Sequence, residues 1–176
     1  MDGGRNRGPG GQLITLAIEK ARAVETEELI HATRPRRISL RPYHPAVDAA
    51  LVFDSWCKQI RRVAPFRSMD GQDFHEHRRI IEALVARCSP IIAYETGHPA
   101  QRHGYACGEV QQDGKQVLHM VYVRRIWRRR GTAGTLLKTL FPDLGKAPVY
   151  YTHDTRSARY HAGRWRLRLN HYLVHP

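Results

Sequence analysis

The stretch from Val117 to Leu140 constrains the fold of this chain more than any other. It reads VLHMVYVRRIWRRRGTAGTLLKTL, which predicts a strand, a basic turn with glycine and an amphipathic helix. Such a turn leaves backbone N–H groups unpaired at a helix start, where the helix dipole attracts anions. Five arginines lie in the same turn: Arg124, Arg125, Arg128, Arg129 and Arg130. The stretch therefore predicts a site for a ligand that carries phosphate.

Positive charge is concentrated toward the C-terminus. The 176 residues carry a formal net charge of +13, and residues 122–176 hold 12 basic against 2 acidic side chains, a net charge of +10. Residues 1–34 hold five of each sign and are neutral overall. So basic a segment attracts anions, and we expect a nucleotide-like cofactor, nucleic acid or an acidic protein as its partner.

The cysteines and histidines predict no metal site. Cys57, Cys88 and Cys107 are far apart and odd in number, so neither a zinc site nor a disulfide framework is indicated, and we expect buried, reduced thiols. His75 and His77 are two residues apart in a helical pattern, which points them to different faces.

The apolar runs are short. None reaches the ~18 residues of a membrane helix, and the start, MDGGRNRGPGG, does not resemble a secretory signal. We therefore expect a cytoplasmic protein with no membrane partner.

Two parts of the chain are predicted to be separate. Residues 1–34 combine a glycine-rich tail with a helix over 13–32, and we interpret them as a helical arm that docks on the core or on a neighbouring chain, either a second copy or an assembly partner. Residues 35–176 form the main domain. Its alternating segments predict a mixed α/β fold, in which an antiparallel meander leads into a parallel β-α-β crossover. Strands are expected at 37–41, 91–95, 103–110, 116–123, 148–153 and 167–175, and helices at 48–62, 72–87, 133–141 and 154–160.

This order and the central turn resemble the GNAT acetyltransferase superfamily, whose acetyl-CoA signature is Gln/Arg-x-x-Gly-x-Gly/Ala. Here the signature reads RRRGTA over residues 128–133, followed by Gly134. The resemblance covers about residues 36–176. It implies an α+β mixed sheet with the acyl-CoA N-acyltransferase fold, and acetyl-CoA as the cofactor.

The resemblance also implies which residues hold acetyl-CoA. Small residues let the backbone approach a pyrophosphate, and arginines add attraction for its charge. The strand before the turn would expose peptide groups at Val121 and Val123 to the amide-bearing arm of the cofactor. The turn residues implied are Arg128, Arg129, Arg130, Gly131, Thr132, Ala133 and Gly134.

The catalytic groups depart from the family pattern. The family often uses a Glu on the strand before the signature and a Tyr after the next strand, but the strand QVLHMVYV contains no carboxylate. His119 is the candidate base and Glu109, on the partner strand, the second; a structural histidine is the alternative. Tyr160 is the candidate acid. The spacing of its segment is more compressed than in the family pattern, and the alternative is a tyrosine that only packs.

Two functions therefore stay open. The first is an acetyl-CoA-dependent N-acetyltransferase that acts on a primary amine. The second is a GNAT-fold structural component that binds nucleic acid or a partner protein through its basic C-terminal third. Runs such as FDSWCKQIRR and HRRIIEALV also resemble small GNAT-like proteins of tailed bacteriophages, which would imply a place in the host cytoplasm or the virion.

Overall fold

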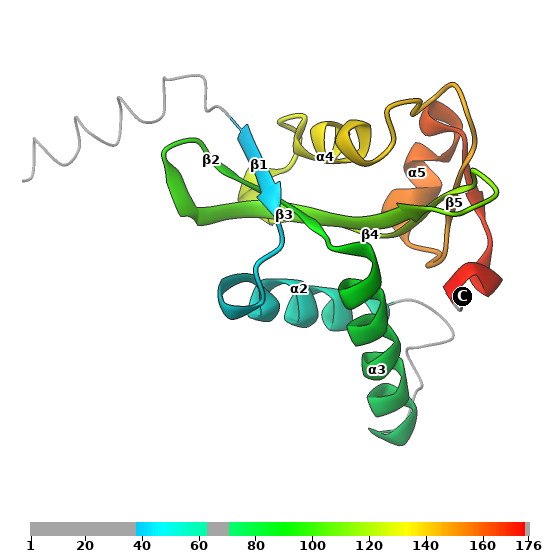
Figure 1. The fold of residues 1–176 in the computed structure, drawn as a ribbon, viewed down its shortest axis with the longest axis horizontal. Coiled ribbons are helices and arrows are strands. Elements are labelled where there is room, and N and C mark those ends of the chain that lie inside the picture. The colour runs from blue at the N-terminus through cyan, green and yellow to red at the C-terminus, as the bar shows by residue number, and fades with distance from the viewer. Residues whose placement is uncertain (1–37, 63–70, 175–176) are drawn as a thin grey trace, which may run out of the picture. The chain divides into compact units, whose positions relative to one another are not determined.

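A computed structural model describes residues 38–62 and 71–174 of the chain. Within these ranges the strands form one mixed sheet in chain order (Figure 1). β1 to β4 are antiparallel neighbours, whereas β4, β5 and β6 are parallel. The strands are β1 (Ile38–Pro42), β2 (Ile91–Glu95), β3 (His98–Val110), β4 (Gln116–Val123), β5 (Val149–Tyr151) and β6 (Leu167–Leu169). The predicted arm, residues 1–34, lies outside the described residues.

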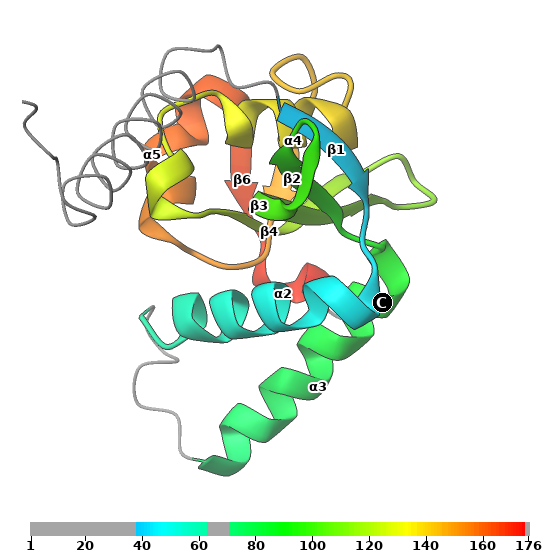
Figure 2. The same ribbon diagram turned by 90° about the vertical axis from the view of Figure 1, so that its left-hand side faces the viewer.

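Helices cover both faces of this sheet (Figures 1 and 2). One face carries α2 (Pro45–Ile60) and α3 (Gly71–Cys88), and the other carries α4 (Thr132–Leu140) and α5 (Arg156–Trp165). Apolar residues spaced three and four apart on α2, among them Val52 and Trp56, pack with Tyr105 and Met120 of the sheet. Leu118, on the opposite face of β4, packs on the α4–α5 side. The mixed α/β architecture predicted from the sequence is confirmed.

Three element boundaries differ by five residues or more from those expected. β3 already begins at His98, whereas the strand was expected from residue 103. Helix α5 continues past residue 160, the expected end, to Trp165, because the left-handed residue that stops it is Arg166 (φ 50°). β6 ends at Leu169, because the Asn170 side chain accepts the Tyr172 N–H in a turn and a short 3₁₀ helix, η3 (His171–Val174), follows.

A bulge in β4 shapes the middle of the sheet. Cys107 lies opposite Met120 but Gly108 lies opposite Leu118, so His119 is an extra residue on β4. Gly108 is required here because a Cβ at this position would lie 2.6 Å from the Val117 carbonyl oxygen. Beyond the bulge β4 continues to Val123, whereas its pairing with β5 covers only 116–118. The two parallel strands therefore separate at His119.

Candidate functional site

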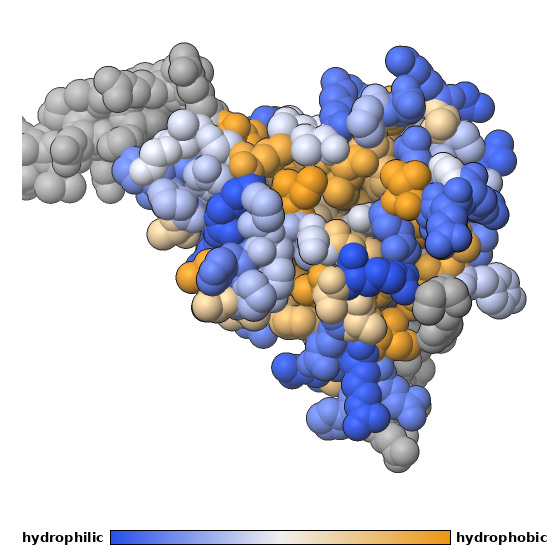
Figure 3. Space-filling view, viewed as in Figure 1, coloured by the Kyte–Doolittle hydropathy of each residue, from blue (hydrophilic) through white to orange (hydrophobic). Residues whose placement is uncertain are grey.

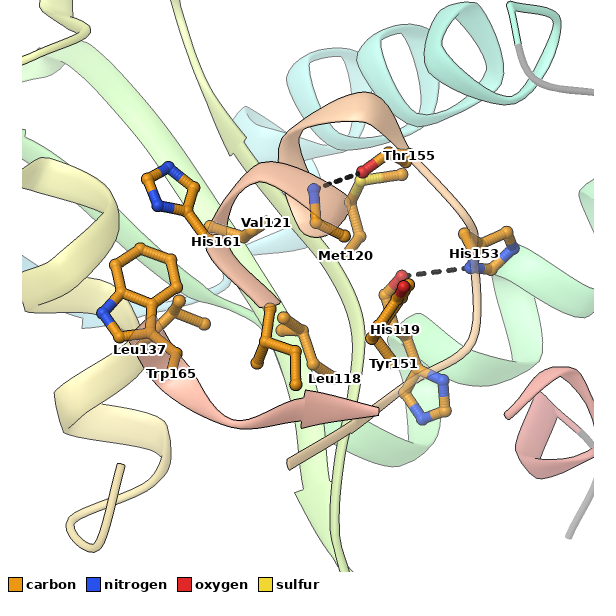
Figure 4. Close-up of a pocket in the computed structure, with 12 residues that line it drawn as sticks. Leu118, His119, Met120, Val121, Leu137, Tyr151, His153, Thr155, His161 and Trp165 are labelled. Carbon is orange, nitrogen blue, oxygen red and sulfur yellow. Dashed lines mark hydrogen bonds between the residues drawn. The ribbon is translucent and has the colours of Figure 1, made fainter. Parts of the chain in front are cut away.

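A narrow cleft opens where β4 and β5 separate, beneath α5 (Figure 4). Its cavity of about 30 Å³ has room for about two water molecules. His161 and Trp165 of α5 lie on one side and His153 on the other. The lining residues are Leu118, His119, Met120, Val121, Leu137, Tyr151, His153, Thr155, Ala158, His161, Trp165 and Leu167.

The β4 backbone presents a free edge to this cleft. The Arg124 N–H donates to the His103 carbonyl on β3. Because hydrogen-bonded pairs alternate along an antiparallel ladder, the peptide groups of Val121 and Val123 point away from β3, toward the side that β5 has left. The Val123 carbonyl accepts a hydrogen bond from Arg128 Nε at 2.9 Å. Val121 thus keeps its peptide group toward the cleft, with no strand pairing on that side among the described residues.

Helix α4 begins beside this edge, and its first turn has no side-chain cap. Gly131, at φ 81°, is the N-cap, and no side chain caps the helix. The N–H groups of Thr132, Ala133 and Gly134 therefore lie in the uncapped first turn, where an anion is favoured. A Cβ built on Gly131 or Gly134 would meet no described atom within 4 Å. The predicted phosphate turn is therefore an uncapped helix start, and its binding of phosphate stays a prediction.

A buried aromatic contact supports the arginine turn. Trp127, in the 3₁₀ helix η2 (Arg125–Trp127), is 5% exposed and its ring stacks on His103 with centroids 3.7 Å apart. His103 Nε2 lies 3.2 Å from a carboxylate oxygen of Glu95. The Arg130 guanidinium lies over the Trp127 ring, 5.2 Å from the ring centroid. Trp127 was not among the predicted site residues, and the pattern RRIWRRR alone does not distinguish it from Ile126, which is exposed.

The two predicted base candidates touch each other. His119 is 2% exposed, and its Nε2 lies 3.2 Å from Glu109 Oε1. Burial alone would raise the pKa of Glu109, but hydrogen bonds from Arg87 and His119 outweigh it and lower the pKa. Glu109 is then a carboxylate, which only accepts hydrogen bonds, so Nε2 of a neutral His119 carries the proton. Nδ1 keeps its lone pair and lies 3.4 Å from Thr152 Oγ1.

Further histidines gather around Thr152, although their sequence positions showed no pattern. His153 Nδ1 lies 2.9 Å from Thr152 Oγ1 and 3.1 Å from the His119 carbonyl oxygen. His171 Nδ1 lies 2.9 Å from the Thr152 carbonyl oxygen, and the His77 ring meets the His153 ring edge-on at 5.6 Å. Burial, with the neighbouring His77, lowers the pKa of His153 to about 4. His153 is therefore neutral at pH 7. These histidines come from four parts of the fold, namely β4 (His119), the segment after β5 (His153), α3 (His77) and η3 (His171).

The predicted acid lies away from these groups. The Tyr160 side chain is 83% exposed and does not line the cleft. The next residue, His161, does line it, and its ring stacks on Trp165 with centroids 4.4 Å apart. Burial lowers the pKa of His161. The role of Tyr160 as acid stays a prediction.

The thiols are less buried than expected. Cys107 is fully buried, but Cys57 and Cys88 are only partly so. Among the described residues all three are free thiols. No helix within the described ranges is both long enough and apolar enough to pass through a bilayer.

Comparison with known proteins relates the fold to acetyltransferases. A Pyrococcus furiosus protein assigned as an acetyl transferase matches 73% of this chain and 91% of its own at 11% identity, with a TM-score of 0.50. A GCN5-related N-acetyltransferase from Rhodopseudomonas palustris matches 72% and 79%, at 20% identity and a TM-score of 0.47. AAC(6')-Iy in complex with a bisubstrate analogue of CoA matches 59% and 69%, at 13% identity and a TM-score of 0.37. No family model and no curated protein matches the sequence.

The fold is therefore that of the GNAT acetyltransferases, as the resemblance of the central turn implied. At such low identity the likeness concerns the fold, and the chemistry has to be argued from the site.

Proposed function

We propose that this protein is an acetyl-CoA-dependent N-acetyltransferase whose acceptor is a primary amine. The observation that carries the proposal is the juxtaposition of an uncapped helix start with a free strand edge, at Gly131–Gly134 and Val121. An anion site beside a free strand edge suits a ligand that carries both a pyrophosphate and an amide-bearing arm.

The chain's own residues fit these two parts. The N–H groups of Thr132, Ala133 and Gly134 would donate to pyrophosphate oxygens, and the exposed arginines of the turn would add attraction. The Val121 peptide group would pair with the amide arm. Arg128 would have to release the Val123 carbonyl to extend that pairing. Since the cleft holds only about 30 Å³, His161 and Trp165 would have to swing aside for the arm to enter.

The proton chemistry is assigned to the dyad of His119 and Glu109. The acceptor amine must lose a proton before it attacks the thioester carbonyl, and Nδ1 of His119 carries the lone pair that can take it. His119 lines the cleft, and the hydroxyl of the buried Thr152 lies 3.4 Å from Nδ1, where it can hydrogen-bond the imidazole. The Glu109 carboxylate would stabilise the imidazolium that results. Tyr160 is kept as the proposed proton source for the departing thiolate.

Calorimetry with acetyl-CoA tests the proposal. The unaltered chain should bind, and Gly131→Glu should weaken binding by at least about 10-fold, because a carboxylate at the helix start repels the pyrophosphate. Gly114→Glu is the matched control: Gly114 has φ 80°, against 81° for Gly131, and open space around it, but it lies in the β3–β4 turn. The absence of binding by the unaltered chain would overturn the proposal.

A second candidate function rests on the exposed basic residues. Arg124, Arg125 and Arg129 are exposed in the turn, and hydrophilic residues gather around α5 in the space-filling view (Figure 3). A GNAT-fold component that holds nucleic acid or an acidic neighbour, in a virion or elsewhere, would use this surface. Salt-dependent DNA binding without acetyl-CoA binding would favour it.

A further inference from the structure

Four side chains with metal-binding chemistry converge between α3 and the bulge of β4. Cys88 is the last residue of α3, Cys107 and Glu109 are two apart on β3 and share a face, and His119 is the bulged residue of β4. One donor atom each from Cys88, Glu109 and His119 lie within 4.8 Å of one another. The Cys88 thiol also interacts with the Cys107 thiol and with the His119 imidazole.

We propose that Cys88, Cys107, Glu109 and His119 bind one thiophilic divalent metal ion, best matched by Zn²⁺. Thiolate, imidazole and carboxylate are the donors that zinc uses, four at a time and tetrahedrally. Zinc–ligand distances of about 2.0–2.3 Å place tetrahedral donors about 3.5 Å apart, so the donor atoms of Cys88, Glu109 and His119, now within 4.8 Å of one another, have to approach by about 1 Å. The Cys107 thiol, which lies 3.9 Å from the Leu84 carbonyl oxygen, has to turn toward them. Metal binding at this site does not require the proposed function, although it uses the same His119 and Glu109 side chains.

The charges around the cluster favour a dication. Two thiolates and the Glu109 carboxylate bring three negative charges, and Arg87, which donates to both Glu109 oxygens at 2.9 and 2.8 Å, brings one positive charge. A dication makes this partly buried group neutral, which minimises the cost of burying charge. Contact with Cys107 and His119 lowers the pKa of Cys88 to about 5. The proton that Cys107 keeps would leave when the metal binds.

The neighbours of the cluster can serve as outer partners. A carboxylate has about four lone-pair sites, so Glu109 can bind a metal while Arg87 holds it in place. The ion would replace the contact between Glu109 and Nε2 of His119. Nδ1 of His119 would then donate to Thr152 Oγ1, the second hydrogen bond that orients most histidine ligands.

Occupancy has a consequence for catalysis that rests on the proposed function. A metal on Nε2 leaves Nδ1 protonated, so His119 can no longer accept the proton of the amine. The zinc-bound protein should therefore be inactive in acetyl transfer, and chelation should restore the activity.

Cobalt titration of the reduced, metal-free full chain tests the site directly. Binding of one Co²⁺ per chain should produce visible ligand-field bands and a near-ultraviolet thiolate-to-metal band, and Zn²⁺ should abolish both. Cys88→Ser and Cys107→Ser should weaken Co²⁺ binding more than about 100-fold, beyond the 10- to 100-fold typical of lost outer partners. Cys57→Ser is the control, because this third thiol lies on α2, outside the cluster.

The result that overturns the site is a Co²⁺ complex with no thiolate band, or Cys57→Ser weakening binding as much as Cys88→Ser does. Circular dichroism identifies variants that fail to fold, and for those Cys88→Ala and Glu109→Gln replace the serine variants. Because Co²⁺ binding requires no acetyl-CoA, its failure is distinct from failure of the calorimetry with Gly131→Glu.

Discussion

His119 and Glu109 meet across the β3–β4 ladder, with Nε2 of the histidine 3.2 Å from Oε1 of the glutamate. The bulge at His119 makes this contact possible, because His119 has no partner residue of its own on β3. Arg87 holds the carboxylate from α3. The Glu109 carboxylate on β3 thus links helix α3 and the bulge of β4 through its hydrogen bonds with Arg87 and His119.

Glu109→Gln tests the importance of this contact. An amide can donate to Nε2, which would move the imidazole proton to Nδ1 and remove the proposed basic nitrogen. We expect kcat for acetyl transfer to fall by about 10²-fold or more. Urea unfolding should show a loss of stability of about 1–3 kcal/mol, because Arg87 loses its charged partner.

Glu82→Gln is the matched control for that variant. Glu82 pairs with Arg78 four residues away, and both side chains are about half exposed, so its loss should cost only about 0.3–0.5 kcal/mol. Equal effects of the two substitutions on stability and kcat would contradict the role given to Glu109.

Stability should depend on the protonation of His153. The pKa of this residue is about 4 in the folded chain, against about 6.5 in an unfolded one. Between these values the unfolded chain binds the extra proton, so the free energy of unfolding falls as the pH drops from about 6.5 toward 4, by on the order of 3 kcal/mol. Urea unfolding at several pH values measures the loss.

His153→Gln removes the titrating group and should flatten this dependence. The exposed His75 on α3 supplies the control, and His75→Gln should keep the slope of the unaltered chain. An unchanged slope in His153→Gln would show that other groups control acid stability.

Trp165→Ala should open the cleft. The Trp165 indole lines the cleft and stacks on His161. A ligand that enters the variant does not have to displace this ring. We expect acetyl-CoA to bind about 3- to 10-fold more tightly, measured by calorimetry. Tyr172→Ala, at a residue 90% exposed and outside the cleft, should change nothing; weaker binding by Trp165→Ala would show that the indole contacts the ligand instead.

Among the acidic residues that form ion pairs, we expect substitution of Asp48 to lower the stability most. It is fully buried and binds Arg41 through two hydrogen bonds of 2.6 and 2.8 Å, and it also accepts the His44 N–H. Asp48→Ala leaves the Arg41 guanidinium without this partner at the junction of β1 and α2, and should cost about 3–5 kcal/mol in chemical denaturation. Asp113→Asn, in the exposed β3–β4 turn, should leave the unfolding midpoint unchanged.

Local signals in the sequence were enough for most of the fold. The Asp-Gly turn at residues 113–114 and the glycine before α4 each act over a few residues, and the structure has both. The start of β3 was harder to predict, because the glycine and proline in TGHPAQR are typical of a longer turn. In the structure the turn is only two residues long, and His98 pairs with Glu95 directly across it.

The candidate site was less predictable because its parts come from different elements. His119 was recognised from its strand, but Arg87, the partner of Glu109, lies 22 residues before that glutamate, and no spacing rule connects the two. Cys88 and Cys107 looked unrelated for the same reason. The bulge that turns His119 toward them is invisible in the pattern QVLHMVYV, since it arises from the register between β3 and β4.

The short ladder between β4 and β5 also affects the behaviour of the chain in a crowded solution. A strand that extends beyond its neighbour leaves peptide groups unpaired. A strand of another molecule can pair with these groups, which is a common origin of aggregation. Here α5 places His161 and Trp165 over that opening. The helix that narrows the entrance for a ligand thus also shields the strand edge at Val121 from other chains. Variants that loosen α5 should therefore be judged by their solubility as well as by their affinity.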